Sequence, residues 1–172
     1  GNDAASLYLV GGVVRDWVSK QKFSNDWDYV ITDSKLSAKN VAEKIAAATK
    51  STLVPLHPEF GIYRVVLHQN SDIQNTETLY LDFAQAQDGL GKIGTLETNL
   101  ARRDLSINAI ALHATSGELI DPYNGLADLK SKTIRMISPQ NLKDDPLRLL
   151  RVFRFGAVIN AQAYDAQTLE TG

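Results

Sequence analysis

The stretch LYLVGGVVRDWVSKQKFSNDWDYVIT, residues 7–32, decides the fold class of this sequence. It opens with an apolar run of strand-forming residues that ends at Gly11 and Gly12. Residues 13–20 have apolar side chains at helical spacing, and WDYVIT then has the composition of a second strand. The stretch therefore predicts a strand, a glycine turn, a short helix and a second strand.

The two glycines could serve a ligand or only the turn. Glycines between a strand and a helix let the backbone come close to a phosphate, and a helix N-terminus offers free N–H groups. The spacing around Gly11 and Gly12 matches neither the G-x-G-x-x-G fingerprint nor the P-loop. A plain tight turn explains the pair without any ligand.

Asp26 and Asp28 lie two residues apart in the second predicted strand. Alternate residues of a strand point to the same face, so both carboxylates can converge on one ion. Two aspartates suit Mg²⁺, which takes few protein ligands and completes its shell with water and substrate phosphates. The spacing excludes an EF-hand, while a solvated turn at a strand entry explains the pair without a metal.

Asp82 is a third candidate carboxylate, placed between apolar neighbours in the predicted strand ETLYLDFA. An unpaired charge in such a position is costly. Asp82 could therefore join a metal site with the first two aspartates, or it could pair with Arg64 on a neighbouring strand.

The segment ARRDLSINAIAL carries the next candidates, Arg102, Arg103, Asp104 and Asn108. The first three are predicted to open a helix, which would put Asp104 and Asn108 on one helical face. The arginine fork suits phosphate, and an aspartate can accept a hydrogen bond from a ribose hydroxyl. A salt bridge at a helix start is the alternative.

The segment DDPLRLLR predicts another helix start, with Asp145, Arg148 and Arg151 projecting from one face. Together an aspartate and an arginine offer the acceptors and donors that the edge of a nucleobase requires. An N-cap with an ion pair three residues along is the simpler explanation of Asp145.

The remaining pattern predicts an α+β fold, because strands and helices follow each other in mixed order. Further expected elements are a helix at 36–50 capped by Ser37, an edge strand at 51–56, a hairpin of strands 60–68 and 77–84 turning at 69–76, a flexible loop at 87–95, a helical block at 96–114 and a helix from about 144.

Composition narrows the class of protein. The 172 residues suit one domain, or one domain and the start of another, and no apolar run or signal peptide predicts a membrane segment. No cysteine is present, which excludes disulfides and thiolate metal sites and fits a cytoplasmic location. The net charge of −2 gives no global attraction to nucleic acid, although basic residues are in local excess between 128 and 154.

The order of LVGGVVRD, D-x-D, RRDLSINAIAL, DPYNGLADL and DDPLRLLRVFRF, across residues 7–159, is more specific than any one motif. It resembles the class II tRNA nucleotidyltransferase and bacterial poly(A) polymerase family, within the superfamily that includes DNA polymerase β. The resemblance implies a polymerase β-like nucleotidyltransferase head domain at 1–140, built on a small mixed β-sheet flanked by helices. It also implies that 141–172 begin a helical neck, so we expect a fragment that lacks the family's body and tail.

The resemblance also implies roles for the candidate residues. Gly12 and Arg15, with the adjacent Gly11, would lie at the nucleotide triphosphate, and Asp26 and Asp28 would bind metal. The other assigned positions are Arg102 and Arg103 at phosphate, Asp104 at the ribose, and Asp145, Arg148 and Arg151 at the base of ATP or CTP. Two departures are Asp144 in place of the family's usual glutamate and Gln87 where relatives often have arginine.

The implied activity is template-independent addition of CMP or AMP to an RNA 3′ end, expected to belong to tRNA. Two Mg²⁺ ions about 4 Å apart would share Asp26 and Asp28, with Asp82 assisting the first ion or accepting a proton. A poly(A) polymerase shares these motifs. A non-catalytic nucleotide- or RNA-binding module and a transferase acting on a small molecule or a protein are further alternatives, and the sequence predicts no oligomeric state.

Overall fold

The computed structural model describes residues 6–69, 77–88, 92–143, 145 and 147–171. Its strands are β1 Leu7–Val10, β2 Asp26–Ile31, β3 Thr52–His57, β4 Ile62–Gln69, β5 Glu77–Gln85, β6 Ala111–His113, β7 Leu119–Ile120, β8 Thr133–Ile134 and β9 Ala163–Tyr164. Its helices are α1 Gly12–Val18, α2 Ala38–Thr49, α3 Leu96–Ala101, α4 Gly125–Ser131, α5 Pro139–Lys143, α6 Leu147–Val158 and α7 Ala166–Thr171, with 3₁₀ turns η1 Pro58–Phe60 and η2 Ser106–Asn108.

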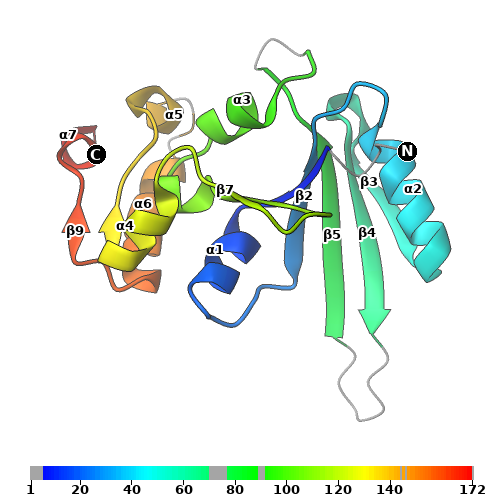
Figure 1. Ribbon diagram of the computed structural model, residues 1–172, viewed down its shortest axis with the longest axis horizontal. Helices are drawn as coiled ribbons and strands as arrows, with labels where there is room; N and C mark the ends of the chain where they lie inside the picture. Colours follow the sequence, from blue (N-terminus) through cyan, green and yellow to red (C-terminus); the bar gives the residue numbers. More distant parts are fainter. Residues whose placement is uncertain (1–5, 70–76, 89–91, 144, 146, 172) are drawn as a thin grey trace.

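The centre of the fold is a mixed sheet with the strand order β3-β4-β5-β2-β1-β6-β7. Strands β2 and β5 are parallel, and the other neighbouring strands pair antiparallel. Helix α2 covers one face of the β3-β4-β5 half (Figure 1), where Ala42, Val65 and Phe83 belong to one buried cluster. This arrangement confirms the predicted α+β class with a mixed sheet flanked by helices.

The opening unit follows the sequence prediction. Strand β1, the Gly11 turn, α1 and β2 follow one another, and β1 pairs antiparallel with β2. The predicted cap of α2 is also confirmed, because the Ser37 hydroxyl accepts a hydrogen bond from the Asn40 N–H at 3.1 Å. Local polar and apolar patterning thus determines this part of the fold.

The predicted sheet margin and hairpin are confirmed as well. Strand β3 lies at the edge of the sheet, and its register shifts between Pro55 and His57. Strands β4 and β5 pair antiparallel over their length. Residues 70–76, where the hairpin turn was expected, lie outside the described residues, as do residues 89–91 of the expected loop.

The predicted helical block at 96–114 is wrong. Helix α3 ends at Ala101, residues 106–108 form the 3₁₀ turn η2, and 111–113 form β6, which pairs with β1. The backbone is extended at Leu105, whose side chain is fully buried and which forms a β-bridge with Met136. Distant pairing partners therefore override the local helical pattern, so residues 102–104 follow a helix and do not open one.

The C-terminal segment packs against the sheet domain through one apolar cluster. Leu105 and Ile107 share this cluster with Leu142, Val152 and other residues of the last helices. Figure 1 shows α4, α5 and α6 together beside the end of the sheet domain that carries α1 and α3. This packing sets α6 opposite β2 and thereby defines one side of the site described next.

Among the described residues, no helix combines the length and the apolar character needed to cross a membrane.

Candidate active site

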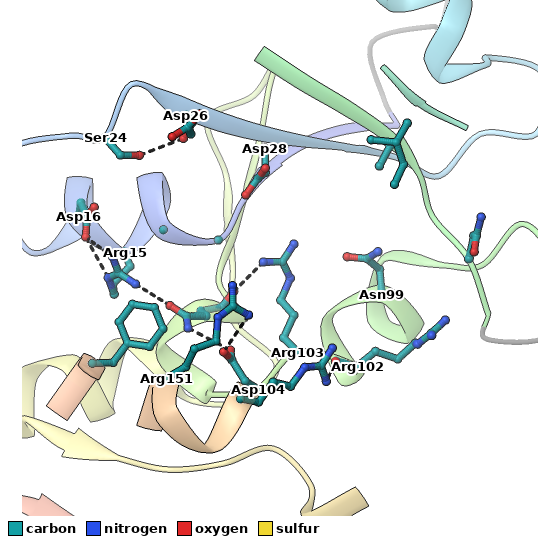
Figure 2. A pocket seen from close by; sticks show the side chains of 18 of the residues that line it. Arg15, Asp16, Ser24, Asp26, Asp28, Asn99, Arg102, Arg103, Asp104 and Arg151 are labelled. Carbon is teal, nitrogen blue, oxygen red and sulfur yellow. Dashed lines mark hydrogen bonds and ion pairs between the residues drawn. The ribbon is translucent and has the colours of Figure 1, made fainter. Parts of the chain in front are cut away.

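A cavity of about 820 Å³ collects most of the candidate residues (Figure 2). The sequence-predicted residues that line it are Gly11, Gly12, Arg15, Asp26, Asp28, Arg102, Arg103, Asp104, Asn108, Arg148 and Arg151. Asp82 and Asp145 do not line it. The cavity thus joins the glycine turn, β2, the segment after α3 and the cavity-facing side of α6.

Asp26 and Asp28 occupy alternate positions of β2, and both line the cavity. The register of the sheet places Asp28 beside Val10 of β1 on one side and Asp82 of β5 on the other. The Asp26 side chain keeps 62% of its surface exposed. The two carboxylates therefore stand on one face at the mouth of the cavity, as the strand periodicity predicted.

Electrostatics distinguish Asp28 from an ordinary surface aspartate. Although its side chain reaches the cavity, the surrounding protein removes much of its water, and this burial raises the pKa of Asp28. Arg103 opposes the rise, whereas the nearby charges of Asp82 and Asp26 add to it. Several carboxylates crowded together in this way favour a positively charged partner.

Gly11 explains how Asp28 and Arg103 can approach the turn. Its φ is +78°, and a Cβ atom there would lie 2.9 Å from Arg103 Nη1 and 3.3 Å from Asp28 Oδ2. A side chain at this position would therefore be strained in its backbone and would collide with the guanidinium. At Gly12 an added Cβ would make only an ordinary contact, 3.6 Å from Arg15.

Asp82 is held by Arg64, one of the two partners considered for it. Arg64 Nε donates to Asp82 Oδ1 at 2.6 Å and Nη2 donates to Oδ2 at 2.7 Å. The same guanidinium lies 3.7 Å from Asp26 Oδ1. Each carboxylate oxygen of Asp82 thus accepts a hydrogen bond from Arg64. Arg64, Asp82 and Asp28 lie side by side on the neighbouring strands β4, β5 and β2.

The segment after α3 presents two arginines of different character. Arg102 is exposed, whereas the Arg103 guanidinium is deeply enclosed, and burial lowers its pKa while Asp28 and Asp104 raise it. Arg103 Nη1 donates to the Asn108 carbonyl oxygen at 3.2 Å. Its Nε is buried and has no hydrogen-bond partner in the described part of the chain. Arg103 therefore retains donor capacity beside the cavity.

Asp104 is buried behind this arginine pair. Its Oδ1 accepts from the Leu105 N–H at 2.8 Å and from Asn108 Nδ2 at 3.0 Å, and its Oδ2 lies 3.4 Å from Arg151 Nη1. The expected helical face does not exist here, but the 3₁₀ turn still brings Asp104 and Asn108 together.

Arg15 lines the cavity and donates three side-chain hydrogen bonds to neighbouring residues. Nε and Nη2 donate to Asp16 Oδ1 at 2.9 and 2.7 Å, and Nη1 donates to Asn108 Oδ1 at 2.7 Å. Its Cζ lies 4.6 Å from the centre of the Phe155 ring on α6. The side chain is only 8% exposed.

Asp145, two residues before the first residue of α6, caps the helix and forms an ion pair, as the simpler explanation predicted. Its Oδ1 accepts from the Leu147 N–H at 3.0 Å, and its Oδ2 lies 3.6 Å from Arg148 Nε. Arg148 Nη1 also donates to the carbonyl oxygens of Arg102 and Asn141, at 2.9 and 3.0 Å. These contacts fix Arg148 across the cavity from β2.

Sequence reasoning missed several lining residues. Asp16, Ser24, Asn99, Arg154 and Phe155 all line the cavity, and the Asn99 Oδ1 is buried without a hydrogen-bond partner among the described residues. Phe155 and Arg154 could have been found from their helical spacing to Arg151. No sequence pattern indicated Asn99 as a site residue, because its position at the cavity depends on the end of α3 at Ala101, which the sequence did not predict.

The donor set limits which metal site is feasible. No group of three or more His, Cys, Asp or Glu side chains suited to a metal is present within the described ranges. The available set is the pair Asp26 and Asp28, with Asp82 already bound to Arg64. Two carboxylate ligands are typical of Mg²⁺ that is completed by water and phosphate.

The fold is that of solved tRNA-processing nucleotidyltransferases. A tRNA nucleotidyltransferase complexed with a primer tRNA and an incoming ATP analog matches with a TM-score of 0.80 and 32% identity, over 96% of this chain and 45% of that chain. A CCA-adding enzyme with ATP matches with a TM-score of 0.80 and 30% identity, over 96% of this chain and 37% of that chain.

The chain belongs to the family described as "Poly A polymerase head domain", whose model matches residues 7–135. A CC-adding tRNA nucleotidyltransferase of Synechocystis sp. is 38% identical over 150 residues, which cover 87% of this chain and 32% of the relative. A multifunctional CCA protein of Vibrio cholerae is 40% identical over 156 residues, which cover 90% and 36%. The chain thus spans about a third of the length of these relatives.

Proposed function

We propose that this chain is the catalytic head of an enzyme that adds nucleotides, without a template, to the 3′ end of an RNA. The relatives include a CC-adding tRNA nucleotidyltransferase and a multifunctional CCA protein, and matching solved structures contain a primer tRNA with an ATP analog, or CTP, which supports tRNA as the RNA and CTP and ATP as nucleotide donors. A tRNA substrate would also imply a cytoplasmic location.

One observation carries the proposal. Two carboxylates at alternate positions of β2 line a single cavity together with several arginines from the other walls. The cavity also reaches Gly11, where a side chain would collide with Arg103. Phosphoryl transfer depends mainly on positioning and charge neutralisation, and this arrangement supplies groups for both. A merely RNA-binding surface would not require the carboxylate pair.

Asp26 and Asp28 fit a divalent metal site, and we assign them as the ligands of Mg²⁺. Asp28 lies beside Asp82 in the sheet and close to Asp26, and burial followed by these neighbouring charges raises its pKa, so a bound cation would favour its charged form. Bound Mg²⁺, expected as two ions, would lower the pKa of the RNA 3′-hydroxyl and neutralise charge on the triphosphate. Asp82 would act indirectly, by holding Arg64 beside Asp26.

The other cavity residues would hold the nucleotide. Arg102 and Arg103 line the cavity and would donate to phosphate oxygens. Asp104 would accept from the ribose, and Arg148, which Asp145 holds through an ion pair, would read the base edge. This last pair belongs to residues 141–172, which we interpret as the start of a helical neck that follows a head domain at 1–140.

Relatives of both CC-adding and complete CCA-adding types match this chain, so the head alone leaves the number and order of added nucleotides open. A poly(A) polymerase is the alternative within the family. A non-catalytic nucleotide- or RNA-binding module is the alternative outside it, and the presence of both Asp26 and Asp28 disfavours that module.

The decisive experiment uses the full-length protein with Mg²⁺, a tRNA lacking its 3′ end, and each nucleoside triphosphate supplied separately. Sequencing the products should reveal added C, added A or both. A long homopolymer of A on diverse RNAs would support the poly(A) polymerase instead. Nucleotide binding without any extension of the RNA would leave only the non-catalytic module.

A further inference from the structure

The cavity has an uncharged rim on the side of β4 and β5. The residues that form this rim are Phe60, Ile62, Ala84, Gln85 and Gln87. Ile62 pairs with Ala84 across the two strands, and Gln87 Nε2 donates to the Phe60 carbonyl oxygen at 3.2 Å. The turn before β4 and the end of β5 are therefore joined into one surface. The arginines that line the cavity come from other elements: α1, the segment after α3, and α6.

The uncharged rim begins close to the assigned metal ligands. Asp82 of β5 lies opposite Asp28 of β2 in the register of the sheet. Ala84 is two residues beyond Asp82, so it faces the same side of the sheet about 7 Å further along the strand. A ribose and its base span a comparable distance. An RNA end whose 3′-hydroxyl lies at Asp26 and Asp28 can therefore place its base against the rim.

Phe60 is the aromatic residue of the rim, and its ring is open to solvent although its backbone is held. The residue is 56% exposed. It ends the 3₁₀ turn that begins at Pro58, and the N–H of Gly61, which has a φ of +67°, donates to the Pro58 carbonyl oxygen at 3.2 Å. The ring of His57 lies 6.3 Å away at an angle of 53°. Because the backbone is already fixed, little ordering is needed when a flat ligand stacks on the ring.

The amide nitrogens of the rim already donate to the protein. Gln85 Nε2 donates to the carbonyl oxygens of Ile31 and Asp33 at 3.1 and 2.9 Å, and Gln87 Nε2 donates to that of Phe60. Such a surface suits the flat face of a nucleobase better than its hydrogen-bonding edge. Every base has this face, so stacking tolerates any sequence. An enzyme that adds both C and A meets different 3′ bases in turn, and a tolerant contact suits this task.

The incoming nucleotide is expected on the other side of the carboxylates. The groups that we assign to its phosphates and its base belong to the segment after α3 and to α6. In phosphoryl transfer the attacking and leaving oxygens lie roughly in line across the reacting phosphorus. The attacking RNA end therefore has to approach Asp26 and Asp28 from the side that the arginines leave free, which is the uncharged rim.

We propose that Phe60 is the stacking surface for the base of the RNA's 3′-terminal nucleotide. This inference rests on the proposed function and adds the place where the second substrate is held. The Phe60 ring carries the terminal base, and the 3′-hydroxyl of the same nucleotide lies at the carboxylate pair. Removing the ring should weaken the hold on the RNA and leave the hold on CTP and ATP nearly unchanged.

The first test separates the two substrates in the full-length protein with Mg²⁺. Primer extension on a tRNA lacking its 3′ end gives the KM for the RNA and the KM for CTP or ATP. Phe60→Ala should raise the KM for the RNA about tenfold, as expected for one lost base–aromatic stack, and should change the KM for either nucleotide by less than about twofold. Phe60→Trp, which keeps a stacking face, should bind the RNA as the parent does.

Phe23→Ala is the matched control. Phe23 is also an exposed phenylalanine in a connecting segment, at 45%, but it does not line this cavity. Its substitution should leave both KM values unchanged. Because both side chains are exposed, circular dichroism should show an intact fold in each variant.

A second test removes the base and keeps the protein. An RNA whose last nucleotide is abasic retains its 3′-hydroxyl, and the parent should extend it with a kcat/KM about tenfold below that of the intact RNA. Phe60→Ala should show no further loss on the abasic RNA, because the contact is already absent. An abasic nucleotide one position earlier should affect the parent and Phe60→Ala equally.

Three results would overturn the inference. The first is a KM for the RNA that Phe60→Ala leaves unchanged or that Phe23→Ala raises equally. The second is a raised KM for CTP or ATP, which would assign Phe60 to the incoming nucleotide. The third is an abasic loss that persists in full in Phe60→Ala. A parent protein that extends no RNA would contradict the proposed function itself, and that outcome is distinguishable because it does not depend on Phe60.

Discussion

The two walls of the cavity are built by different means. The β2 wall is part of a sheet, where backbone pairing fixes Asp28 between Val10 and Asp82. The α6 wall is held by side chains: the apolar cluster that includes Val152, the Phe155 contact with Arg15 and the hydrogen bonds of Arg148 to backbone carbonyls. We expect residues of the β2 wall to take part in phosphoryl transfer and residues of the α6 wall to select the nucleotide.

The largest effect is expected at the sheet wall. Asp28→Ala removes one of two assigned metal ligands without disturbing the strand pairing, so RNA extension should fall by roughly a thousandfold or more. Primer extension measures the loss, and circular dichroism should show an unchanged fold. An Asp28→Ala protein that still extends an RNA primer at a normal rate would contradict the assigned roles of both aspartates.

A smaller loss is expected at the glycine turn, next to Asp28 and Arg103. Gly11→Ala would push a Cβ into Arg103 Nη1 and strain a backbone at φ +78°, so kcat should fall by about a hundredfold through misplacement of Arg103 and Asp28. Gly117→Ala is the matched control, since its φ is +71° but an added Cβ meets no atom within 4 Å. Equal activity losses in the two variants would show that backbone strain alone, and not the crowded site, is responsible.

Substitution of Asp82 tests whether this residue of β5 takes part in the reaction directly or only holds Arg64. Asp82→Asn weakens the grip on Arg64 but leaves the cavity lining intact, so extension should fall by only about tenfold, as for a lost charged hydrogen bond. Steady-state kinetics at several Mg²⁺ concentrations measure this. A loss as severe as that of Asp28→Ala would instead make Asp82 a direct participant.

The smallest effect on the rate is expected at the helix wall. A Cβ at Gly156 would overlap the Tyr164 hydroxyl, so Gly156→Ala should force α6 and β9 apart and lower the unfolding free energy by about 1–3 kcal/mol. Thermal unfolding reports the stability, and competition between CTP and ATP reports the altered selection. If extension were lost while the stability stayed normal, the division between the two walls would be wrong.

The sequence predicted the sheet wall better than the helix wall because strand periodicity is local. Asp26 and Asp28 fall on one face in any two-residue repeat, and Ser37 caps its helix through a residue three positions along. Asp82 showed the limit of this reasoning. The register sets Asp82 between Arg64 and Asp28, so only the hydrogen bonds of the folded structure show that Arg64 holds it.

Longer-range contacts account for what could not be predicted. The β-bridge between Leu105 and Met136 interrupts the helix expected at 96–114, and the local sequence pattern does not predict this bridge. Arg15 and Asn108 are 93 positions apart, so their hydrogen bond depends on the complete fold.

The margins of the sheet have a consequence for the behaviour of the protein at high concentration. Strand β3 carries a proline and a register shift at one margin, and β7, at the other, is only two residues long. Neither offers a long, regular row of free N–H and C=O groups on which a strand from another molecule could add. We therefore expect the folded domain to resist edge-to-edge aggregation.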